Sequence, residues 1–206
     1  MKTLAIIAQK GGAGKTTVAL NLAIASALAK RQTVLVDIDM QASAHKWSRL
    51  RKLDDPAIIK CQEPKLKMVA ESAKTAGADL LVIDTAPHSE KASLTAAQLA
   101  DFILIPVKPS NLDLDAIADS VNIAQLAKKP AAFILNDCKA NSNLTKEAQD
   151  ALKTYEVPIA PITWGSRVAF ISSLKYGQGV LEYEPKGKGA QEVQKLYNFI
   201  KKQMGS

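Results

Sequence analysis

Six short, almost wholly apolar segments recur along this chain, and stretches with helical patterning separate them. The apolar segments cover residues 3–8, 33–37, 79–84, 102–107, 132–135 and 158–162, and the expected helices cover residues 18–30, 42–52, 65–75, 114–127, 145–155 and 190–203. Strands without polar alternation are typical of a parallel sheet that helices cover on both faces. We therefore expect an α/β fold in which a doubly wound, mostly parallel sheet forms one domain over residues 1–206.

Composition removes several other classes of protein. Apolar residues make up 47% of the chain and charged residues 23%, which is close to the average of soluble globular proteins. No apolar run approaches the length of a spanning helix, and the first residues lack the cleavage site of a signal peptide. Cys61 and Cys138 lie far apart and form no CxxC pair. These features predict a reduced, cytoplasmic protein.

A glycine-rich turn joins the first apolar segment to the first helix, and its sequence runs QKGGAGKTT from Gln9 to Thr17. Glycines let the backbone bend tightly, so that its N–H groups and the positive end of the following helix can surround phosphate oxygens. In such a loop Lys15 contacts the β- and γ-phosphates, and the Thr16 hydroxyl is a ligand of Mg²⁺. The residues expected to bind the phosphates are Gly11, Gly12, Ala13, Gly14, Lys15, Thr16 and Thr17, the last of which could donate to the α-phosphate.

The loop departs from the general pattern at two positions. Gln9 stands where the general motif has glycine, and a second lysine, Lys10, precedes the glycines. With this leading lysine, the sequence KGGxGKTT resembles the deviant Walker A motif of the ParA/MinD family of dimerising ATPases. The resemblance implies a P-loop fold, ATP and Mg²⁺ as ligands, and a homodimer that sandwiches two nucleotides. It also implies that Lys10 and Lys15 are catalytic, with Lys10 acting on the nucleotide of the other subunit.

Three aspartates follow two of the apolar segments. Parallel strands deliver their carboxyl ends to one edge of a sheet, and alternation places Asp37 and Asp39 on the same side. The family pattern DxDPQ implies that Asp39 orients the hydrolytic water and that Asp37 supports the Mg²⁺ shell or the switch geometry, although Met40 replaces the proline. Capping of the next helix is the alternative for such a pair. Asp84 ends a Walker B pattern and is expected to bind Mg²⁺ directly or through water.

Further matches lie in the second half of the chain. Residues 105–110 (IPVKPS) resemble the family's PxxPS loop at the dimer interface, and Asp113 with Asp115 is expected to cap the following helix. Asn136 sits where relatives place the residue that reads adenine, but an ordinary asparagine at a strand end is equally consistent. Arg167 resembles an arginine of the same family loop, with DNA binding, the dimer interface or no function left open.

Charge is uneven along the chain. The net charge is +7, and the basic excess lies at residues 45–74 (eight basic, four acidic) and 175–206 (six and three), around an acidic middle. A face suited to a polyanion and a set of solvated lysines are both consistent with this pattern. The lysines that could contact DNA phosphates are Lys175, Lys186, Lys188, Lys195, Lys201 and Lys202.

The motifs together favour a small ParA-type ATPase associated with the nucleoid. Such a protein binds DNA without sequence preference, and a ParB-like or other centromere or cargo adaptor stimulates hydrolysis during plasmid or chromosome partition or cargo positioning. Because the chain begins at the phosphate loop, we expect no N-terminal helix-turn-helix domain. The alternative is a MinD-like membrane-associated ATPase, but the last apolar stripe, over residues 193–200, is expected to be needed by the core. The two cysteines match no motif of the related iron–sulfur reductases.

Overall fold

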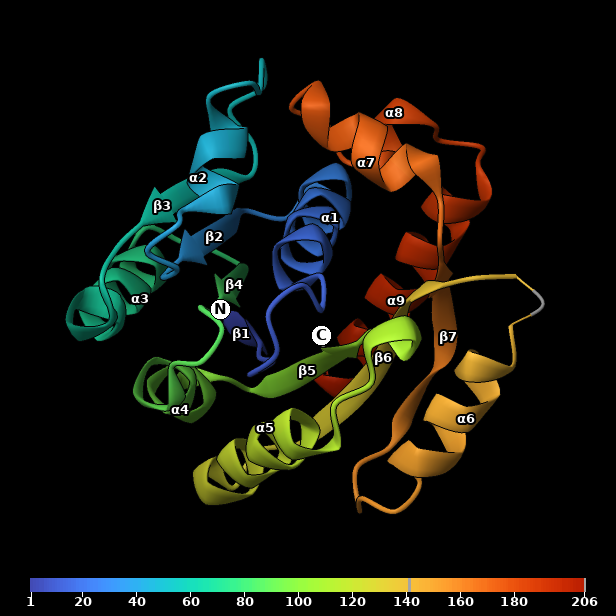
Figure 1. Cartoon of the computed structure of the whole chain (residues 1–206). Helices are drawn as coiled ribbons and strands as arrows, with labels where there is room; N and C mark the ends of the chain where they lie inside the picture. The colour runs from blue at the N-terminus through green and yellow to red at the C-terminus, as the bar shows by residue number, and fades with distance from the viewer. Residues whose placement is uncertain (141, 206) are drawn as a thin grey trace.

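A computed structural model describes residues 1–140 and 142–205, and its centre is a parallel sheet of seven strands (Figure 1). The strands are β1 (Lys2–Ile6), β2 (Thr33–Asp37), β3 (Ala57–Lys60), β4 (Leu80–Asp84), β5 (Phe102–Val107), β6 (Ala131–Cys138) and β7 (Ile159–Gly165). Their order across the sheet is β3-β2-β4-β1-β5-β6-β7, and every pairing of neighbours is parallel. The predicted fold class is therefore confirmed.

Helices cover both faces of this sheet. One face packs against α1 (Lys15–Leu28), α2 (Ser43–Ser48), α7 (Val168–Lys175), α8 (Val180–Tyr183) and α9 (Lys188–Gln203), and the other against α3 (Leu66–Thr75), α4 (Glu90–Leu99), α5 (Leu114–Ala127) and α6 (Asn143–Leu152) (Figure 1). In β1, Leu4 and Ile6 join the first core cluster while Ala5 joins the second. Both faces of the central strands are buried, which explains why their sequences are apolar without alternation.

The sequence patterns missed the strand β3 and the α-helices α4, α7 and α8. β3 is a four-residue edge strand that stays largely exposed, so it lacks the apolar run of a central strand. α4 buries only Ala92, Ser93, Ala96 and Ala97, small residues that give no stripe of large apolar side chains. The short α7 and α8 follow β7 on the side that α9 also covers.

The last helix, α9, confirms the expectation that the core needs the apolar stripe over residues 193–200, and this bears on the membrane alternative. In α9, Val193, Leu196, Tyr197 and Ile200 are buried in the core cluster that includes α1. This apolar stripe is thus part of the fold. None of the helices in the described ranges has the length and apolar character needed to cross a bilayer.

Candidate functional site

The carboxyl ends of five neighbouring strands, β2, β4, β1, β5 and β6, bring the predicted residues to one edge of the sheet. β1 is the central strand, so the glycine-rich loop that follows it lies between the aspartates of β2 and β4 and the polar residues after β5 and β6. This is the edge at which open α/β sheets bind ligands.

The loop has the backbone geometry that its glycines allow. Gly12 and Gly14 have φ angles of 75° and 93°, in the left-handed region that residues with a Cβ rarely adopt. A Cβ on Gly14 would also collide with the side-chain nitrogen of Asn136, which donates a hydrogen bond to the Ala13 carbonyl at 3.0 Å. The asparagine therefore braces the loop against β6. This contact is a role for Asn136 that the sequence did not predict, and its role in reading adenine stays a prediction.

Lys15 is held beneath the loop. Its side chain is buried, and the Nζ atom donates to the Ala8 carbonyl at 2.9 Å and to the Lys10 carbonyl at 3.2 Å. Burial lowers the pKa of this ammonium, and the charges of Asp84 and Asp39 act in the opposite direction. A buried cation surrounded by backbone carbonyls and carboxylates is preorganised for an anionic ligand in the loop.

Two cavities open at this edge and share Gly14 and Thr17. The smaller, of about 250 Å³, is lined by Gly11, Gly12, Gly14, Lys15, Thr16, Thr17, Asp39, Gln41, Ser43 and Pro87. The larger, of about 350 Å³, is lined by Gly14, Thr17, Lys108, Asn136, Asp137, Gly165, Ser166, Arg167, Val168, Phe170 and Ile171. The shared residues connect a phosphate-sized compartment with one large enough for a base and sugar.

The aspartates after β2 have different environments. Asp37 is buried, and its two carboxylate oxygens accept hydrogen bonds from the backbone N–H groups of Asp39 (3.0 Å) and His45 (3.1 Å). Burial is the main cause that raises the pKa of Asp37. Since His45 lies in the first turn of α2, Asp37 accepts a backbone N–H at the start of this helix, and its support of a metal shell stays a prediction. Asp39 accepts a bond from the Gln41 N–H at 2.8 Å and lines the smaller cavity.

Asp84 is the group best placed to hold a cation. It is fully buried at the end of β4, and neither carboxylate oxygen accepts a hydrogen bond among the described residues. Desolvation raises its pKa to about 7, although the neighbouring Thr16 hydroxyl lowers it. Two buried, unpaired oxygens beside the Thr16 hydroxyl fit Mg²⁺, which proteins usually bind through few side chains plus phosphate oxygens. A larger set of side chains is not needed, and the described residues contain no group of three or more His, Cys, Asp or Glu that could enclose a metal.

The raised pKa of Asp84 predicts the pH dependence of the nucleotide-free, metal-free protein. Because the pKa is about 7 in the fold and near 3.8 in the unfolded chain, folding favours the protonated group, and stability falls as pH rises from 4 to 7. Asp84→Asn is expected to remove this loss and to raise the free energy of unfolding by up to about 4 kcal/mol at pH 8.

Urea unfolding of both proteins at pH 5 and pH 8 measures this effect. At pH 5, the difference in free energy of unfolding between Asp84→Asn and the wild type should be less than half of the difference at pH 8. The exposed Asp150→Asn is the control. A variant no more stable than the wild type at pH 8 would show that the buried carboxyl has a normal pKa.

Residues that line the base-sized cavity form two ion pairs that sequence reasoning missed. Lys108 Nζ lies 2.5 Å from the Asp137 carboxylate, and Arg167 forms a two-pronged contact with Glu192 of α9, the shortest distance being 2.5 Å. Arg167 thus has an internal partner, while Lys108 and Asp137 both line the cavity. Asp137 has a φ of 56°, a conformation that its position after a strand did not reveal.

Comparison with known proteins places this edge in a family. The family described as the CobQ/CobB/MinD/ParA nucleotide binding domain matches residues 4–178. The chain belongs to this family. It is 30% identical to the "Maintenance of carboxysome distribution protein A" of Gloeobacter kilaueensis, over 98% of this chain and 94% of that protein. It is 24% identical to the sporulation initiation inhibitor protein Soj of Bacillus subtilis, over 92% of this chain and 94% of Soj.

Solved structures show the same fold. The septum site-determining protein MinD of Pyrococcus horikoshii, complexed with Mg-ADP, superposes with a TM-score of 0.81 at 21% identity, over 99% of this chain and 97% of MinD. The resemblance to the ParA/MinD family that the phosphate loop suggested is therefore confirmed.

Lys10, the leading lysine of the phosphate loop, has a different position from Lys15. Its Nζ atom lies 2.6 Å from the Asp113 carboxylate, and about one third of each side chain is exposed. Asp113 also caps α5, since its other oxygen accepts the Ala116 N–H at 3.1 Å, as the sequence predicts. The two lysines of the loop therefore point to separate partners.

Proposed function

We propose that this chain is a ParA-type ATPase that forms an ATP-sandwich dimer, binds DNA without sequence preference and is stimulated by a partner protein. In this proposal residues 1–206 act as one ATPase domain with ATP and Mg²⁺ as ligands. A cytoplasmic, nucleoid-associated location follows from the DNA binding.

The separation of the two lysines carries the proposal. Lys15 is buried and bonded to carbonyls of its own loop, so it is placed for the nucleotide of its own subunit. Lys10 lies at the rim, partly exposed, with a side-chain partner that it can exchange. A second, solvent-accessible ammonium at a phosphate loop supports a contact to a nucleotide held by another subunit.

Each remaining residue of the site has a role in hydrolysis. Thr16 and Asp84 would hold Mg²⁺, which neutralises charge on the phosphates when bound. Asp39, at the wall of the smaller cavity, would orient the attacking water. Asp37 fixes the turn that carries Asp39 through its bond to the Asp39 N–H. These are roles in positioning and charge stabilisation, which are the main contributions of proteins to phosphoryl transfer.

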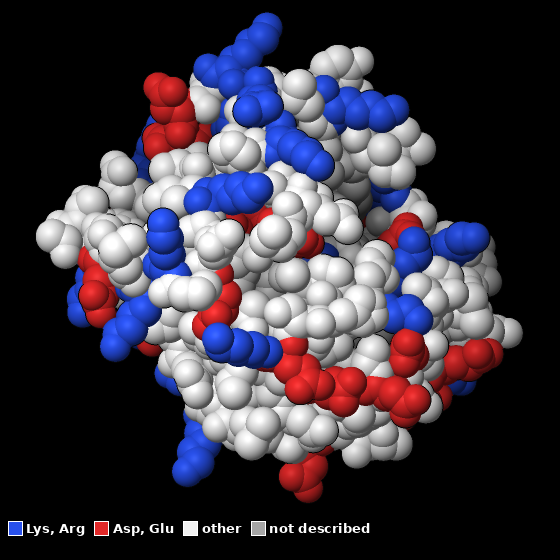
Figure 2. Space-filling model, turned by 60° about the vertical axis from the view of Figure 1, so that its left-hand side comes forward, with Lys and Arg blue, Asp and Glu red and all other residues white. Residues whose placement is uncertain are grey.

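Charge and burial favour DNA over a membrane as the surface to which the dimer binds. On the face shown in Figure 2, Lys and Arg gather mostly in the upper half, while Asp and Glu form a band at the lower right. α2 and α7 lie at the top of Figure 1, and exposed basic residues on or next to them are Lys46, Arg49, Lys52 and Lys175. The apolar stripe of α9 is buried in the core, which leaves it unavailable for a bilayer.

Binding to a random-sequence DNA duplex, measured by fluorescence anisotropy without nucleotide, with ADP and with ATP, tests the DNA part of the proposal. We expect binding with ATP alone, with affinity falling steeply as salt rises and no difference between two unrelated duplexes. Lys15→Ala is the matched control that cannot respond to ATP. Absence of binding in every nucleotide state would contradict the proposal, and ATP-dependent binding to anionic vesicles instead would support the MinD-like alternative.

The names of the relatives suggest two kinds of cargo. Those relatives include a carboxysome distribution protein and a protein named chromosome partitioning protein ParA in Myxococcus xanthus. We propose a ParB-like or other centromere or cargo adaptor as the stimulating partner. The protein encoded next to this chain is the first candidate, and an increase in ATP turnover on adding it together with DNA would identify it.

A further inference from the structure

The contact between Lys10 and Asp113 joins the phosphate loop to the start of α5. β1 and β5 are neighbours in the sheet, so the loop after β1 and the segment after β5 emerge side by side at the same edge. Across this junction Lys10 Nζ donates to Asp113 Oδ2 at 2.6 Å. In the proposed function Lys10 contacts the nucleotide of another subunit. Here it is held instead by a carboxylate of its own subunit.

Asp113 can bind Lys10 and cap α5 at the same time. One oxygen accepts the Ala116 N–H at the start of α5, and the other accepts Lys10. The lysine is the main cause that lowers the pKa of Asp113, so this carboxylate is charged at neutral pH. Helix capping fixes the carboxylate in place, and the lysine is the more mobile partner of the pair.

The Lys10 ammonium lies 2.6 Å from Asp113, so contacts to phosphate oxygens of another subunit would compete with this carboxylate for the same charge. We propose that Asp113 holds Lys10 in the monomer and competes with the partner's nucleotide for it, so that Asp113 sets the affinity of the ATP-bound dimer. The proposal rests on the proposed function, in which Lys10 acts in trans. Asp113 is thus a positioning residue that acts through Lys10.

The expected change in the dimer Kd follows from the exposure of the Lys10–Asp113 pair and from the symmetry of the dimer. About one third of each side chain is accessible, and ion pairs of this kind shift an equilibrium by about 1.4- to 5-fold. Formation of a symmetric dimer breaks two such pairs, one in each subunit, so the fold-change in the dimer Kd is the square of that for one pair. Removal of the charge at Asp113 is therefore expected to lower the dimer Kd by about 2- to 30-fold.

Sedimentation equilibrium with a non-hydrolysable ATP analogue measures this Kd. Asp113→Asn keeps a good capping residue but removes the charge, and Asp115→Asn removes the same charge from an exposed neighbour on the first turn of α5. We expect a lower dimer Kd for Asp113→Asn only, with an unchanged thermal midpoint. In a Lys10→Ala background, Asp113→Asn should leave the Kd within twofold of that of Lys10→Ala alone.

The outcomes separate this inference from the proposed function. A wild type that does not dimerise with the analogue, or a Lys10→Ala variant that dimerises normally, would overturn the function and the inference with it. A wild type that dimerises through Lys10, combined with an Asp113→Asn Kd that is unchanged or higher, would overturn the inference alone. An equal decrease for Asp115→Asn would assign the effect to general charge and also overturn it.

Discussion

Replacement of Lys15 by alanine is expected to lower the affinity for ATP by at least about 100-fold, because two or more charge-assisted hydrogen bonds to phosphate are lost. The ammonium is buried and held by the Ala8 and Lys10 carbonyls, so solvent cannot supply an equivalent cation. The variant should stay folded, since burial lowers the pKa of Lys15 and its charge is therefore maintained at a cost to stability.

Titration with a fluorescent ATP analogue measures this loss, and circular dichroism confirms the fold. Lys10→Ala is the matched control, because it also removes a lysine of this loop, but one whose ammonium contacts Asp113 at the rim. We expect Lys10→Ala to bind nucleotide nearly as well as the wild type. An affinity of Lys15→Ala within threefold of wild type would show that the loop does not bind phosphates as assigned.

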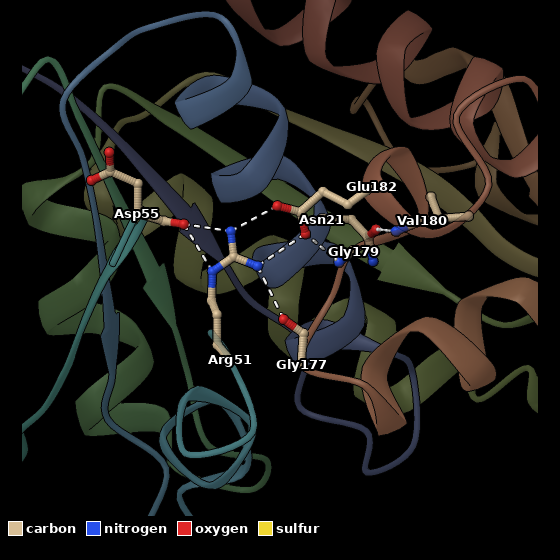
Figure 3. A network of polar contacts seen from close by, with 7 residues as sticks. All are labelled: Asn21, Arg51, Asp55, Gly177, Gly179, Val180 and Glu182. Carbon is tan, nitrogen blue, oxygen red and sulfur yellow. Dashed lines mark hydrogen bonds and ion pairs between the residues drawn. The ribbon is translucent and has the colours of Figure 1, made fainter. Parts of the chain in front are cut away.

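Replacement of Arg51 by alanine is expected to lower the free energy of unfolding by about 3–5 kcal/mol, the cost of removing one member of a buried ion pair. Arg51 lies between α2 and α8, and its guanidinium contacts Glu182 at 2.8 Å and 2.9 Å and the Gly177 carbonyl at 3.0 Å (Figure 3). It also bonds to the Asp55 carbonyl and lies over the Trp47 ring. Only 5% of the Arg51 side chain and 10% of Glu182 are exposed, so Glu182 would remain as an uncompensated charge.

The network around Arg51 continues to the phosphate-loop helix. Glu182 accepts the Gly179 N–H at 2.9 Å, and Asn21 of α1 accepts the Val180 N–H at 2.9 Å (Figure 3). Urea unfolding measures the loss, with Lys153→Ala as the control in an exposed pair with Asp150. The control should be indistinguishable from the wild type. An equally small change for Arg51→Ala would show that the buried pair contributes nothing to stability.

Most of the fold and the phosphate site could be predicted from local sequence patterns. Central strands are buried on both faces, so their apolar runs are visible in the sequence, and the glycines at 12 and 14 meet a backbone requirement within one loop. β3 was missed because an exposed edge strand of four residues has no such run.

Contacts between distant residues could not be read from local pattern. Lys10 and Asp113 are separated by 103 positions, and Arg51 and Glu182 by 131. Lys108 with Asp137 depends likewise on two strand ends meeting in space. Asp37 shows the converse limit, since a carboxylate at a strand end is equally suited to a metal or a helix, and only the structure reveals its bond from the His45 N–H.

Mixing two inactive variants tests most directly whether Lys10 acts in trans. We expect Lys10→Ala and Asp39→Ala each to bind ATP and neither to hydrolyse it. In a mixed dimer, the site of the Lys10→Ala subunit keeps Asp39 and receives Lys10 from its partner, so one of its two sites is complete. Only the mixed dimers hold a complete site, so ATP turnover of an equal mixture should rise well above the sum of the two separate variants. Turnover that stays at the sum of the two separate variants would contradict the account.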